Sequence, residues 1–532
     1  MKLSNSTQMR EIDRYVIDEV GIPGATLMTN ASEHIALAAM EHLAIGGCVA
    51  VFCGAGNNGG DGIGAAAYLM SKGVPVRVFL VGDRTRLTPD SREMLRRLTA
   101  LGGELENFAH ADGDIERYLK GCGVIIDAMF GIGLNSPLRS DALAAVRIIN
   151  ATSAFVISAD IASGVDADTG AILGDAVCAD MTVTFSLAKP GHFIEPGCIR
   201  RGLLRICDIG ISGDIIDGAA SDVYAVMPED ARLPRRRPDS HKGDYGRCLI
   251  IAGSVGYTGA PALSARAATR MGAGLVYLGV PDSIYGIMAT KCDEEMPFPL
   301  PDDGTGRLST AATDEILRRV AKCDVCLIGP GLGVTPALTD LATSVIRESK
   351  APIVLDADAI TAIAANPGIL ATASCPIILT PHLGEFTRLT AALPIASPLT
   401  AASLPIPTAA APSTASALLT TDRLNAARDF ARTHKCALVL KGHRTITALP
   451  DGTVYINTTG GPAMAKGGSG DVLAGMIASL IGQKFTIKDA ITTAVHLHGL
   501  SGDMCAAELG EYSVTASDII SMLPKAAKTA SH

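Results

Sequence analysis

The stretch "VAVFCGAGNNGGDGIGAAAYL", residues 49–69, decides the fold of the first part of the chain. A short apolar run leads into Gly54, Gly56 and Gly59, which fit the G-x-G-x-x-G dinucleotide fingerprint, and a helix of small residues follows. Asp61 falls in the first turn of that helix, where the pyrophosphate of a bound dinucleotide normally rests. The stretch therefore predicts a strand–loop–helix unit that holds a dinucleotide. Asp61 raises the question of whether that dinucleotide is a redox cofactor.

Length and charge limit the class of protein. At 532 residues the chain is too long for one ordinary core, so two or more domains are expected. The net charge of −9 argues against nucleic-acid binding, because a basic surface is needed to neutralise phosphates. The basic cluster "RLPRRRPD" at 232–239 is flanked by prolines and is interpreted as an exposed linker.

Other features favour a cytoplasmic protein that does not enter a membrane. No uncharged apolar stretch approaches the roughly 20 residues that a spanning helix needs. The first residues, "MKLSNSTQMREIDRYVIDE", lack the apolar core of a signal peptide. Thirteen cysteines are scattered without a repeating framework, which predicts free thiols. Cys323 and Cys326 are expected on one strand and facing opposite ways, so they do not predict a zinc site.

Residues 1–222 alternate short apolar runs with helical segments, which predicts an α/β domain with a Rossmann-like parallel sheet and helices on both faces. Ligands of such folds bind beyond the carboxyl ends of the strands. Polar residues gather at three of these ends: Asn57, Asn58 and Asp61 at the first, Asp127 at the second, and Asp160 and Ser163 at the third. Each carboxylate alone also fits a helix cap, so both interpretations stay open at this point.

The alternation restarts after the basic cluster and predicts a second α/β domain, so that the chain divides into 1–222 and 223–532. Residues 391–420 are almost free of charge and rich in Ala, Pro, Ser and Thr, without a sustained period. They are interpreted as a low-complexity surface insertion into the second domain.

A second glycine cluster, "TTGGPAMAKGGSGDVLAGMIASLIGQ" at 458–483, opens a long helix whose bare amides suit a phosphate or a developing anion. No Lys-Ser/Thr pair follows the glycines, so the cluster is not a Walker A loop. Asp471 fits a base toward a substrate hydroxyl, or an acid that only stabilises the helix dipole. Further strand-end loops with glycine or polar groups are "GSVGYTGAPALSARAATRMGAG" (253–274), "GPGLG" (329–333), "TPHLGEF" (380–386, with His382 and Glu385) and "LVLKGHRT" (438–445, with Lys441 and Thr445).

These motifs together resemble one family, the bifunctional NAD(P)H-hydrate repair enzymes. In that family an epimerase domain is fused to a ribokinase-like, nucleotide-dependent dehydratase domain. The resemblance covers almost the whole chain. It is carried by "GAGNNGGDG", "DAMFGIGLNSPL", "SADIASGVDADTG" and "AKPGH" in the first domain, and by "GYTGAPALSARAA", "GPGLG", "LDADA", "TPHLGEF", "KGHRT" and "GGSGD" in the second.

For 1–222, the resemblance implies that the dinucleotide is the substrate, a damaged cofactor with a hydroxyl at C6 of its nicotinamide ring, whose R and S forms this domain interconverts. It places a potassium ion on Asn58, Asp127 and Ser163, and Asp160 is expected to act in proton transfer. The implied substrate contacts are Asn57, Asn58, Gly59, Gly60, Asp61, Gly131, Ile132, Gly133, Leu134, Asn135, Ser136, Pro137 and Asp160.

For 223–532, the resemblance implies phosphorylation of the C6 hydroxyl with Asp471 as base, followed by loss of phosphate. ADP is expected over ATP as the co-substrate, with magnesium on its phosphates, and a homo-oligomer is expected. The implied substrate contacts are Ala260, Gly331, His382 and Asp471, and the implied nucleotide contacts are Lys441, Gly442, His443, Arg444, Thr445 and Gly470.

Two alternatives remain from the sequence. A ribokinase-like kinase of a vitamin precursor would use the second domain alone, and the fused first domain argues against it. A binding module without catalysis would need only the dinucleotide loop, and Asp160 with the potassium triad argues against that.

Overall fold

The computed structural model describes residues 1–108, 113–391 and 422–531, and the chain forms two compact units. The first unit is Lys2–Val223, and the second is Tyr224–His532 together with Met1. The predicted insertion at 391–420 lies, except for its first residue, outside the described residues and stays a prediction.

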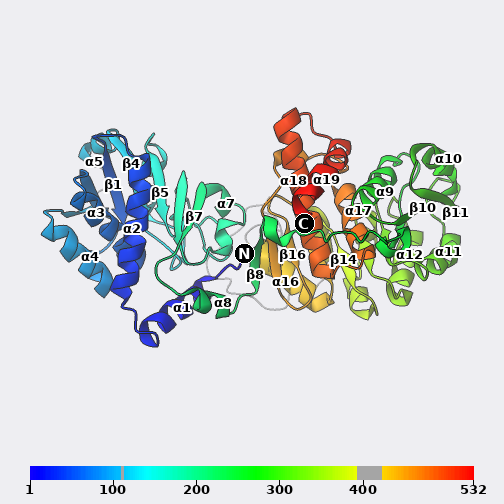
Figure 1. Cartoon of the computed structure of the whole chain (residues 1–532), viewed down its shortest axis with the longest axis horizontal. Helices are drawn as coiled ribbons and strands as arrows, with labels where there is room; N and C mark the ends of the chain where they lie inside the picture. The colour runs from blue at the N-terminus through cyan, green and yellow to red at the C-terminus, as the bar shows by residue number, and fades with distance from the viewer. Residues whose placement is uncertain (109–112, 392–421, 532) are drawn as a thin grey trace, which may run out of the picture. The chain divides into compact units, whose positions relative to one another are not determined.

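The first unit is built on a seven-stranded sheet of order β3-β2-β1-β4-β5-β6-β7, in which all neighbouring strands run parallel (Figure 1). The strands are β1 (Cys48–Cys53), β2 (Val76–Leu80), β3 (Leu105–Asn107), β4 (Cys122–Ala128), β5 (Phe155–Ala159), β6 (Met181–Phe185) and β7 (Leu203–Cys207). Their almost continuous apolar runs fit a sheet that is buried on both faces.

Helices cover both faces of this sheet, as predicted. Side chains of α1 to α4 pack into one apolar core, and side chains of α5 and α6 pack into a separate core. The helices are α1 (Ser6–Asp18), α2 (Gly24–His42), α3 (Asn57–Ser71), α4 (Pro89–Ala100), α5 (Gly113–Leu119), α6 (Ser140–Asn150), α7 (Gly197–Arg200) and α8 (Gly213–Gly218).

The fingerprint glycines allow close backbone packing around β1. A Cβ on Gly59 would stand 1.8 Å from the carbonyl oxygen of Gly54, and a Cβ on Gly54 would stand 2.0 Å from the carbonyl oxygen of Met129. Gly56 is the N-cap of α3 and has open space at the same position. Two of the three glycines are therefore required by the fold itself, and Gly56 faces the region where a ligand would lie.

The second unit contains a ten-stranded sheet of order β11-β10-β9-β12-β13-β14-β15-β16-β17-β8. Its strands from β11 to β15 run parallel, and β15, β16 and β17 form an antiparallel end. The strands are β8 (Val223–Val226), β9 (Arg247–Ile251), β10 (Leu275–Pro281), β11 (Met296–Leu300), β12 (Val325–Ile328), β13 (Ile353–Leu355), β14 (Ile377–Leu379), β15 (Ala437–Leu440), β16 (Ile446–Ala448) and β17 (Val454–Asn457).

Helix α17, which begins after the second glycine cluster, is the centre of one helical layer. It packs against α9 and α18, and α18 packs against α19. A Cβ on Gly475 of α17 would stand 2.1 Å from the carbonyl oxygen of Ser264 in α9, so small residues allow this contact. The helices are α9 (Gly259–Arg270), α10 (Asp282–Lys291), α11 (Thr313–Val320), α12 (Pro336–Glu348), α13 (Asp358–Ile363), α14 (Leu383–Ala391), α16 (Arg423–His434), α17 (Ser469–Gly482), α18 (Ile487–Leu509) and α19 (Ala516–Ala530).

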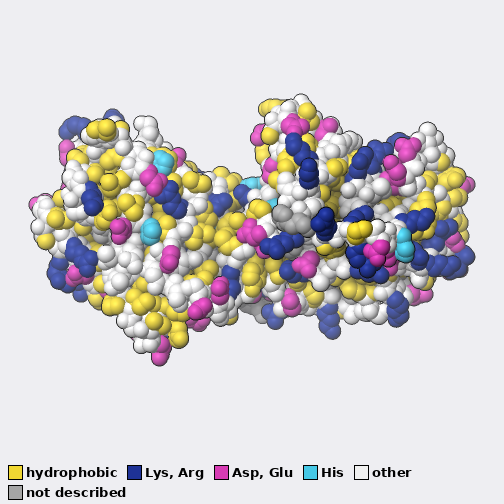
Figure 2. All heavy atoms as spheres, in the orientation of Figure 1, with side chains coloured by type: hydrophobic (Ala, Val, Ile, Leu, Met, Phe, Trp, Pro, Cys, Tyr) yellow, Lys and Arg dark blue, Asp and Glu magenta, His cyan; other side chains and the backbone are white. Residues whose placement is uncertain are grey.

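The surface carries charges of both signs. Figure 2 shows Lys and Arg side chains interspersed with Asp and Glu side chains on the visible face. In the basic segment, the Arg236 guanidinium lies 3.8 Å from the centre of the Tyr245 ring and donates to the carbonyl of Gly272 at 2.5 Å. Within the described part of the chain, no helix is long and apolar enough to cross a membrane.

Candidate active sites

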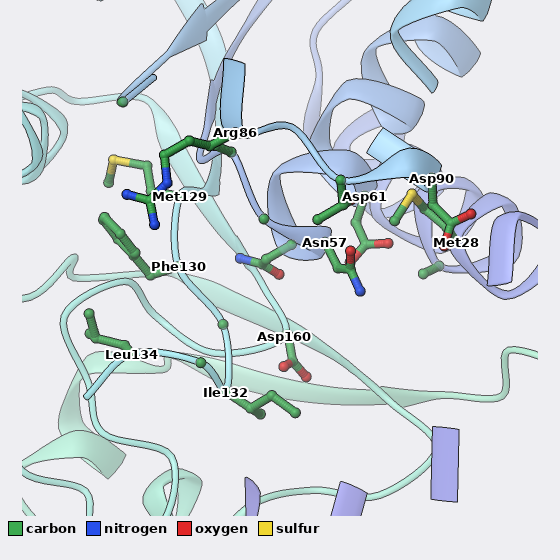
Figure 3. Close-up of a pocket in the computed structure, with 18 of the residues that line it drawn as sticks. Met28, Asn57, Asp61, Arg86, Asp90, Met129, Phe130, Ile132, Leu134 and Asp160 are labelled. Atoms are coloured by element: carbon green, nitrogen blue, oxygen red, sulfur yellow. The ribbon is translucent and has the colours of Figure 1, made fainter. Parts of the chain in front are cut away.

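A pocket of about 930 Å³ opens at the carboxyl edge of the first sheet. Its walls come from α1, the start of α3, the loop after β4 and the residue after β5. Figure 3 shows Asn57, Asp61 and Asp160 directed toward the same open space. Polar residues from separate strand ends therefore meet in one cavity.

Many of the predicted dinucleotide contacts line this pocket: Asn57, Asn58, Asp61, Gly131, Ile132, Gly133, Leu134 and Asp160. Gly59 and Gly60 are buried, and a Cβ on Gly60 would stand 2.6 Å from Met28 and Ser91 side-chain atoms, so Gly60 serves helix packing. Asn135, Ser136 and Pro137 continue the loop as exposed residues outside the pocket lining. Contact with a dinucleotide stays a prediction for the whole set.

Asp160 is held by side chains from the next strand and the loop beyond it. Its φ of +63° lies in the left-handed region, which is uncommon for a residue with a Cβ. Its Oδ1 accepts hydrogen bonds from Lys189 Nζ at 2.5 Å and from Thr184 Oγ1 at 2.9 Å. His192 Nδ1 accepts from the Lys189 amide at 3.0 Å, so His192 Nε2 carries the hydrogen and donates to the Asp160 carbonyl at 2.9 Å.

The charges in this pocket move the carboxyl pKa values apart. Burial works to raise the pKa of Asp160, but the Lys189 ammonium outweighs burial and the pKa lies below its usual value. Burial raises the pKa of Asp13 to about 6, with Lys189 opposing and Asp160 adding to the rise. Burial, followed by the charges of Asp160 and Asp13, raises the pKa of Asp61 well above its usual value. Burial lowers the pKa of His192 to about 3, so its ring is neutral.

Asp13 and Lys189 are among the charged residues of the pocket that the sequence-based prediction missed. Asp13 belongs to α1, which precedes the fingerprint and has an ordinary amphipathic pattern, so nothing local marks it. Lys189 stands in "AKPGH", which served only as a motif of resemblance. The sequence did contain a signal for Lys189, which is the one lysine in the otherwise uncharged run "SLAKPGHF". A lysine in such a run is expected to be buried, and a buried lysine needs a charged partner.

Asp127, one of the predicted potassium ligands, is fully buried in β4. Its carboxylate accepts hydrogen bonds from Ser163 Oγ at 2.6 Å, the Ser163 amide at 2.9 Å and Ser158 Oγ at 2.8 Å. Burial raises the pKa of Asp127, and these hydrogen bonds oppose the rise. A cation here would share the Asp127 oxygens with donors that already hold them.

Asn58 supplies the observation that favours a cation at this place. Both polar atoms of its side-chain amide are buried and have no hydrogen-bond partner among the described residues. A Cβ on Gly131 would stand 3.3 Å from Asn58, and the amide of the preceding Phe130 donates to Ser163 Oγ at 2.9 Å. One carboxylate with neutral amide and hydroxyl oxygens is a donor set of low charge, which fits a monovalent ion.

A second charged cluster lies at the carboxyl ends of β13, β14 and β15 and centres on Lys441. Lys441 Nζ donates to Asp356 Oδ1 at 2.8 Å, and Thr380 Oγ1 donates to the same oxygen at 2.6 Å. A Cβ on Gly470 would stand 3.1 Å from Lys441 Nζ, so the ammonium faces the first turn of α17. Asp356 was missed as a site residue, because "LDADA" served only as a motif of resemblance.

Asp471 occupies the first turn of α17 in this cluster. Burial, with the charge of Asp356 adding to it and Lys441 opposing it, raises the pKa of Asp471 to about 7. Burial works to lower the pKa of Lys441, but Asp356 outweighs it and the pKa is raised. The cluster therefore combines a permanently charged lysine with a carboxyl group that exchanges its proton near neutral pH.

His382 and Lys441 are paired in a short bridge between the ends of β14 and β15. The His382 side chain is 55% exposed, and its Nε2 lies 3.3 Å from Glu385 Oε1. The buried Glu385 also accepts from the His382 amide at 2.8 Å. His382 thus stands at the open side of the cluster with a fixed orientation.

Gly331 and Ala260, two further predicted substrate contacts, lie side by side. Gly331 has a φ of +65°, and a Cβ on it would stand 3.2 Å from the Ala260 Cβ and 3.1 Å from the Tyr257 Cβ. Ser254 Oγ donates to the Gly331 carbonyl at 2.7 Å and fixes the loop. The structure thus brings together the first turn of α9, which holds Ala260, and the loop after β12, which holds Gly331.

The predicted nucleotide contacts at 442–445 form the turn between β15 and β16. Arg444 has a φ of +57° and donates to the carbonyl of Thr458, and Thr445 Oγ1 donates to the Gly442 carbonyl at 3.0 Å. Gly442 and His443 are exposed on the turn. Over the described residues, no group of three or more His, Cys, Asp or Glu side chains is placed to hold a metal.

Comparisons with known proteins cover both units. A family model described as "NAD(P)H-hydrate dehydratase" matches residues 248–525, and one described as "YjeF-related protein N-terminus" matches residues 24–191. A bifunctional NAD(P)H-hydrate repair enzyme of Moorella thermoacetica is 37% identical, over 98% of this chain and 96% of the relative. One of Thermofilum pendens is 35% identical, over 99% of this chain and 96% of the relative.

Among solved structures, an ADP/ATP-dependent NAD(P)H-hydrate dehydratase from Bacillus subtilis, co-crystallized with ATP/Mg2+, is 29% identical. It matches 58% of this chain and 99% of its own chain with a TM-score of 0.46. The matched regions of the relatives include the pocket of the first unit and the lysine cluster of the second. The resemblance carried by the motifs is confirmed, and the chain belongs to the family of bifunctional NAD(P)H-hydrate repair enzymes.

Proposed function

We propose that the chain repairs hydrated NAD(P)H in two steps. The first unit interconverts the R and S hydrates, and the second unit uses ADP to dehydrate the S form back to NAD(P)H. Family membership over both units supports this assignment. The observation that carries it is the Asp356–Lys441 pair set against the first turn of α17, where Asp471 stands.

In the second unit, Lys441 and the amides at the start of α17 would hold the terminal phosphate of the nucleotide. Asp471, with a pKa of about 7, takes the proton of the C6 hydroxyl as its oxygen attacks the phosphorus. The phosphorylated oxygen then leaves C6 as phosphate, and loss of a ring proton restores the reduced nicotinamide. ADP supplies the phosphoryl group, and magnesium would neutralise its charge.

In the first unit, Asn58, Asp127 and Ser163 would hold potassium, which would offset the negative charge that Asp61, Asp127 and Asp160 present to an anionic dinucleotide. Asp160, kept ionised by Lys189, would face the ring and favour positive charge on it. The volume of this pocket, about 930 Å³, lies at the upper end of the range for small-molecule sites, as a dinucleotide would require.

The test is a comparison of phosphate donors. The full chain is incubated with an R/S mixture of hydrated NADH and with ADP, ATP or no nucleotide, and the absorbance of the reduced nicotinamide is followed. We expect complete recovery with ADP, because the first unit converts the R form that the second does not use. Recovery that stops at the S fraction would refute the epimerase assignment. A stable phosphorylated product without recovered absorbance would refute the dehydratase assignment in favour of a small-molecule kinase.

A further inference from the structure

Asp13 is placed in the pocket of the first unit by a helix that is fixed at several points. The start of α1 is tied to the loop after β5, because the Ser6 amide and Oγ donate to Asp168 Oδ1 at 2.6 and 2.9 Å. One turn further, Arg10 Nη2 donates to the Ile132 carbonyl at 3.0 Å, in the loop after β4. The apolar side of the helix is buried in the core through Met9, Ile12 and Val16. Asp13 therefore has a defined position beside the predicted dinucleotide loops.

Hydrogen bonding separates the pocket carboxylates into two kinds. The Asp160 carboxylate accepts hydrogen bonds from Lys189 and Thr184, and the residue is buried. Asp13 and Asp61 line the pocket, and neither carboxylate has a hydrogen-bond or ion-pair partner among the described side chains and amides. The structure leaves these two free to interact with a ligand.

Proton transfer to a leaving hydroxyl needs a group whose pKa lies near the working pH. Lys189 keeps Asp160 ionised, so Asp160 holds no proton to give at neutral pH. Burial, with the charges of Asp160 and Asp13 adding to it, raises the pKa of Asp61 well above its usual value. Asp13, with a pKa of about 6, both gives and regains a proton near neutrality. The other charged residues that line the pocket are Arg10, Asp61, Asp83, Arg86, Asp90, Arg139, Asp141, Asp160 and Lys189.

We propose that Asp13 is the proton-transfer group of the epimerisation, and this assignment rests on the epimerase function proposed above. Asp13 gives its proton to the C6 hydroxyl, the C6–O bond breaks with its electrons on oxygen, and water leaves. The lone pair of the ring nitrogen forms a C=N bond, so the ring becomes cationic opposite the Asp160 carboxylate. Water adds to C6 from the other face, and its extra proton passes through solvent in the pocket back to Asp13. Atoms and charges are then restored with the configuration inverted.

The test uses the full chain without nucleotide, a single hydrate epimer as substrate and chiral chromatography as the readout. Asp13→Asn should lower kcat by about 10²–10⁴-fold with KM within a few-fold. Asp13→Glu should recover part of the rate, because the carboxyl is retained. Asp18→Asn, an exposed aspartate at the end of the same helix, is the matched control and should keep the wild-type rate. Dehydration of the S epimer with ADP by the same preparation verifies that the second unit of each variant chain is folded and active.

The pH profile distinguishes a proton-transfer role from a structural one. The acid form of Asp13 starts the reaction, so the wild-type rate should fall as pH rises through about 6. In Asp160→Asn this limb should move to lower pH, because Asp160 helps raise the Asp13 pKa, and in Asp13→Asn it should vanish. Asp13→Asn with wild-type kcat, or a limb that vanishes only in Asp61→Asn or Asp160→Asn, would overturn the proposal. A wild-type chain that does not interconvert the epimers would instead overturn the proposed epimerase function itself.

Discussion

Asp471→Asn is expected to have opposite effects on activity and on stability. The carboxyl group is desolvated at the start of α17, and the charge of Asp356 works against its ionisation. Asparagine keeps the shape of the side chain and imitates the neutral carboxyl, but it accepts no proton from a substrate hydroxyl. Dehydratase activity should therefore fall by about 10²–10⁴-fold, while epimerase activity in the other unit stays unchanged.

The size of the stability effect follows from the pKa of Asp471, which rises from 3.8 to about 7 on folding. A raised pKa in the folded state means that stability present below pH 3.8 is lost progressively as pH rises toward 7. At about 1.36 kcal/mol per pH unit, this loss is at most about 4 kcal/mol above pH 7. The amide introduced by Asp471→Asn does not ionise and avoids the loss. The stability advantage of the variant should thus be small near pH 4 and grow by about 2 kcal/mol or more between pH 5 and pH 8.

Denaturant unfolding of wild type and variant at pH 5 and pH 8 measures this difference, and comparing the two pH values cancels effects of the substitution that do not depend on charge. The wild-type dehydratase rate should also rise with pH through about 7, because the ionised form of Asp471 is the proposed base. A variant that loses stability relative to wild type as the pH rises would refute the reasoning, since it would show that the folded protein favours the Asp471 carboxylate.

Three further predictions test other parts of the structure. Gly59→Ala should destabilise the first unit by about 1–3 kcal/mol or more, because the added Cβ would meet the Gly54 carbonyl. Gly56→Ala places its Cβ in open space and should change the melting temperature little. Equal melting temperatures of the two variants would contradict the packing argument. Lys441→Met should cost about 3–5 kcal/mol of stability, because it leaves the buried Asp356 carboxylate without its ion-pair partner. In denaturant unfolding, the double variant with Asp356→Asn should recover much of this stability without regaining dehydratase activity. A single Lys441→Met variant as stable as wild type would contradict the pairing. Replacing potassium by a bulky organic cation at constant ionic strength should slow epimerisation and leave the rate of dehydration in the second unit unchanged. An unaltered epimerase rate would exclude the cation proposed at Asn58.

Residues that follow an apolar run directly could be located from the sequence. Asp160 follows β5, and Asp471 starts the helix after the second glycine cluster, so strand and helix periodicity placed them. Their surroundings could not be found in this way. Asp160 and Lys189 are 29 positions apart, and Asp356 and Lys441 are 85 apart. Only the order of strands in the sheet brings each pair together, and no local pattern encodes that order.

Asp13 shows the same limit more sharply. Its helix is amphipathic in an ordinary way, and its role depends on α1 being tied to the loops after β4 and β5. The glycine fingerprint correctly predicted a strand–loop–helix unit, β1 followed by α3. It did not reveal that Gly54 and Gly59 are required for close backbone contact inside the fold. That requirement comes from the carbonyl oxygens of Met129 and Gly54, which lie against these two glycines only in the folded chain.

Both units contain the same arrangement of an aspartate, a lysine and a threonine. In each, an aspartate just after a parallel strand accepts hydrogen bonds from a lysine ammonium and a threonine hydroxyl: Asp160 from Lys189 and Thr184, and Asp356 from Lys441 and Thr380. A second carboxyl lies nearby, Asp13 in one unit and Asp471 in the other, and burial raises its pKa, with the paired carboxylate adding to the rise. In the proposed reactions, Asp160 and Asp356 supply fixed charge, and Asp13 and Asp471 move protons. The positive charge of each lysine works to lower the pKa of the second carboxyl in its own unit. Removing either lysine should therefore disturb the proton-transfer residue of its own unit, although the lysine itself transfers no proton.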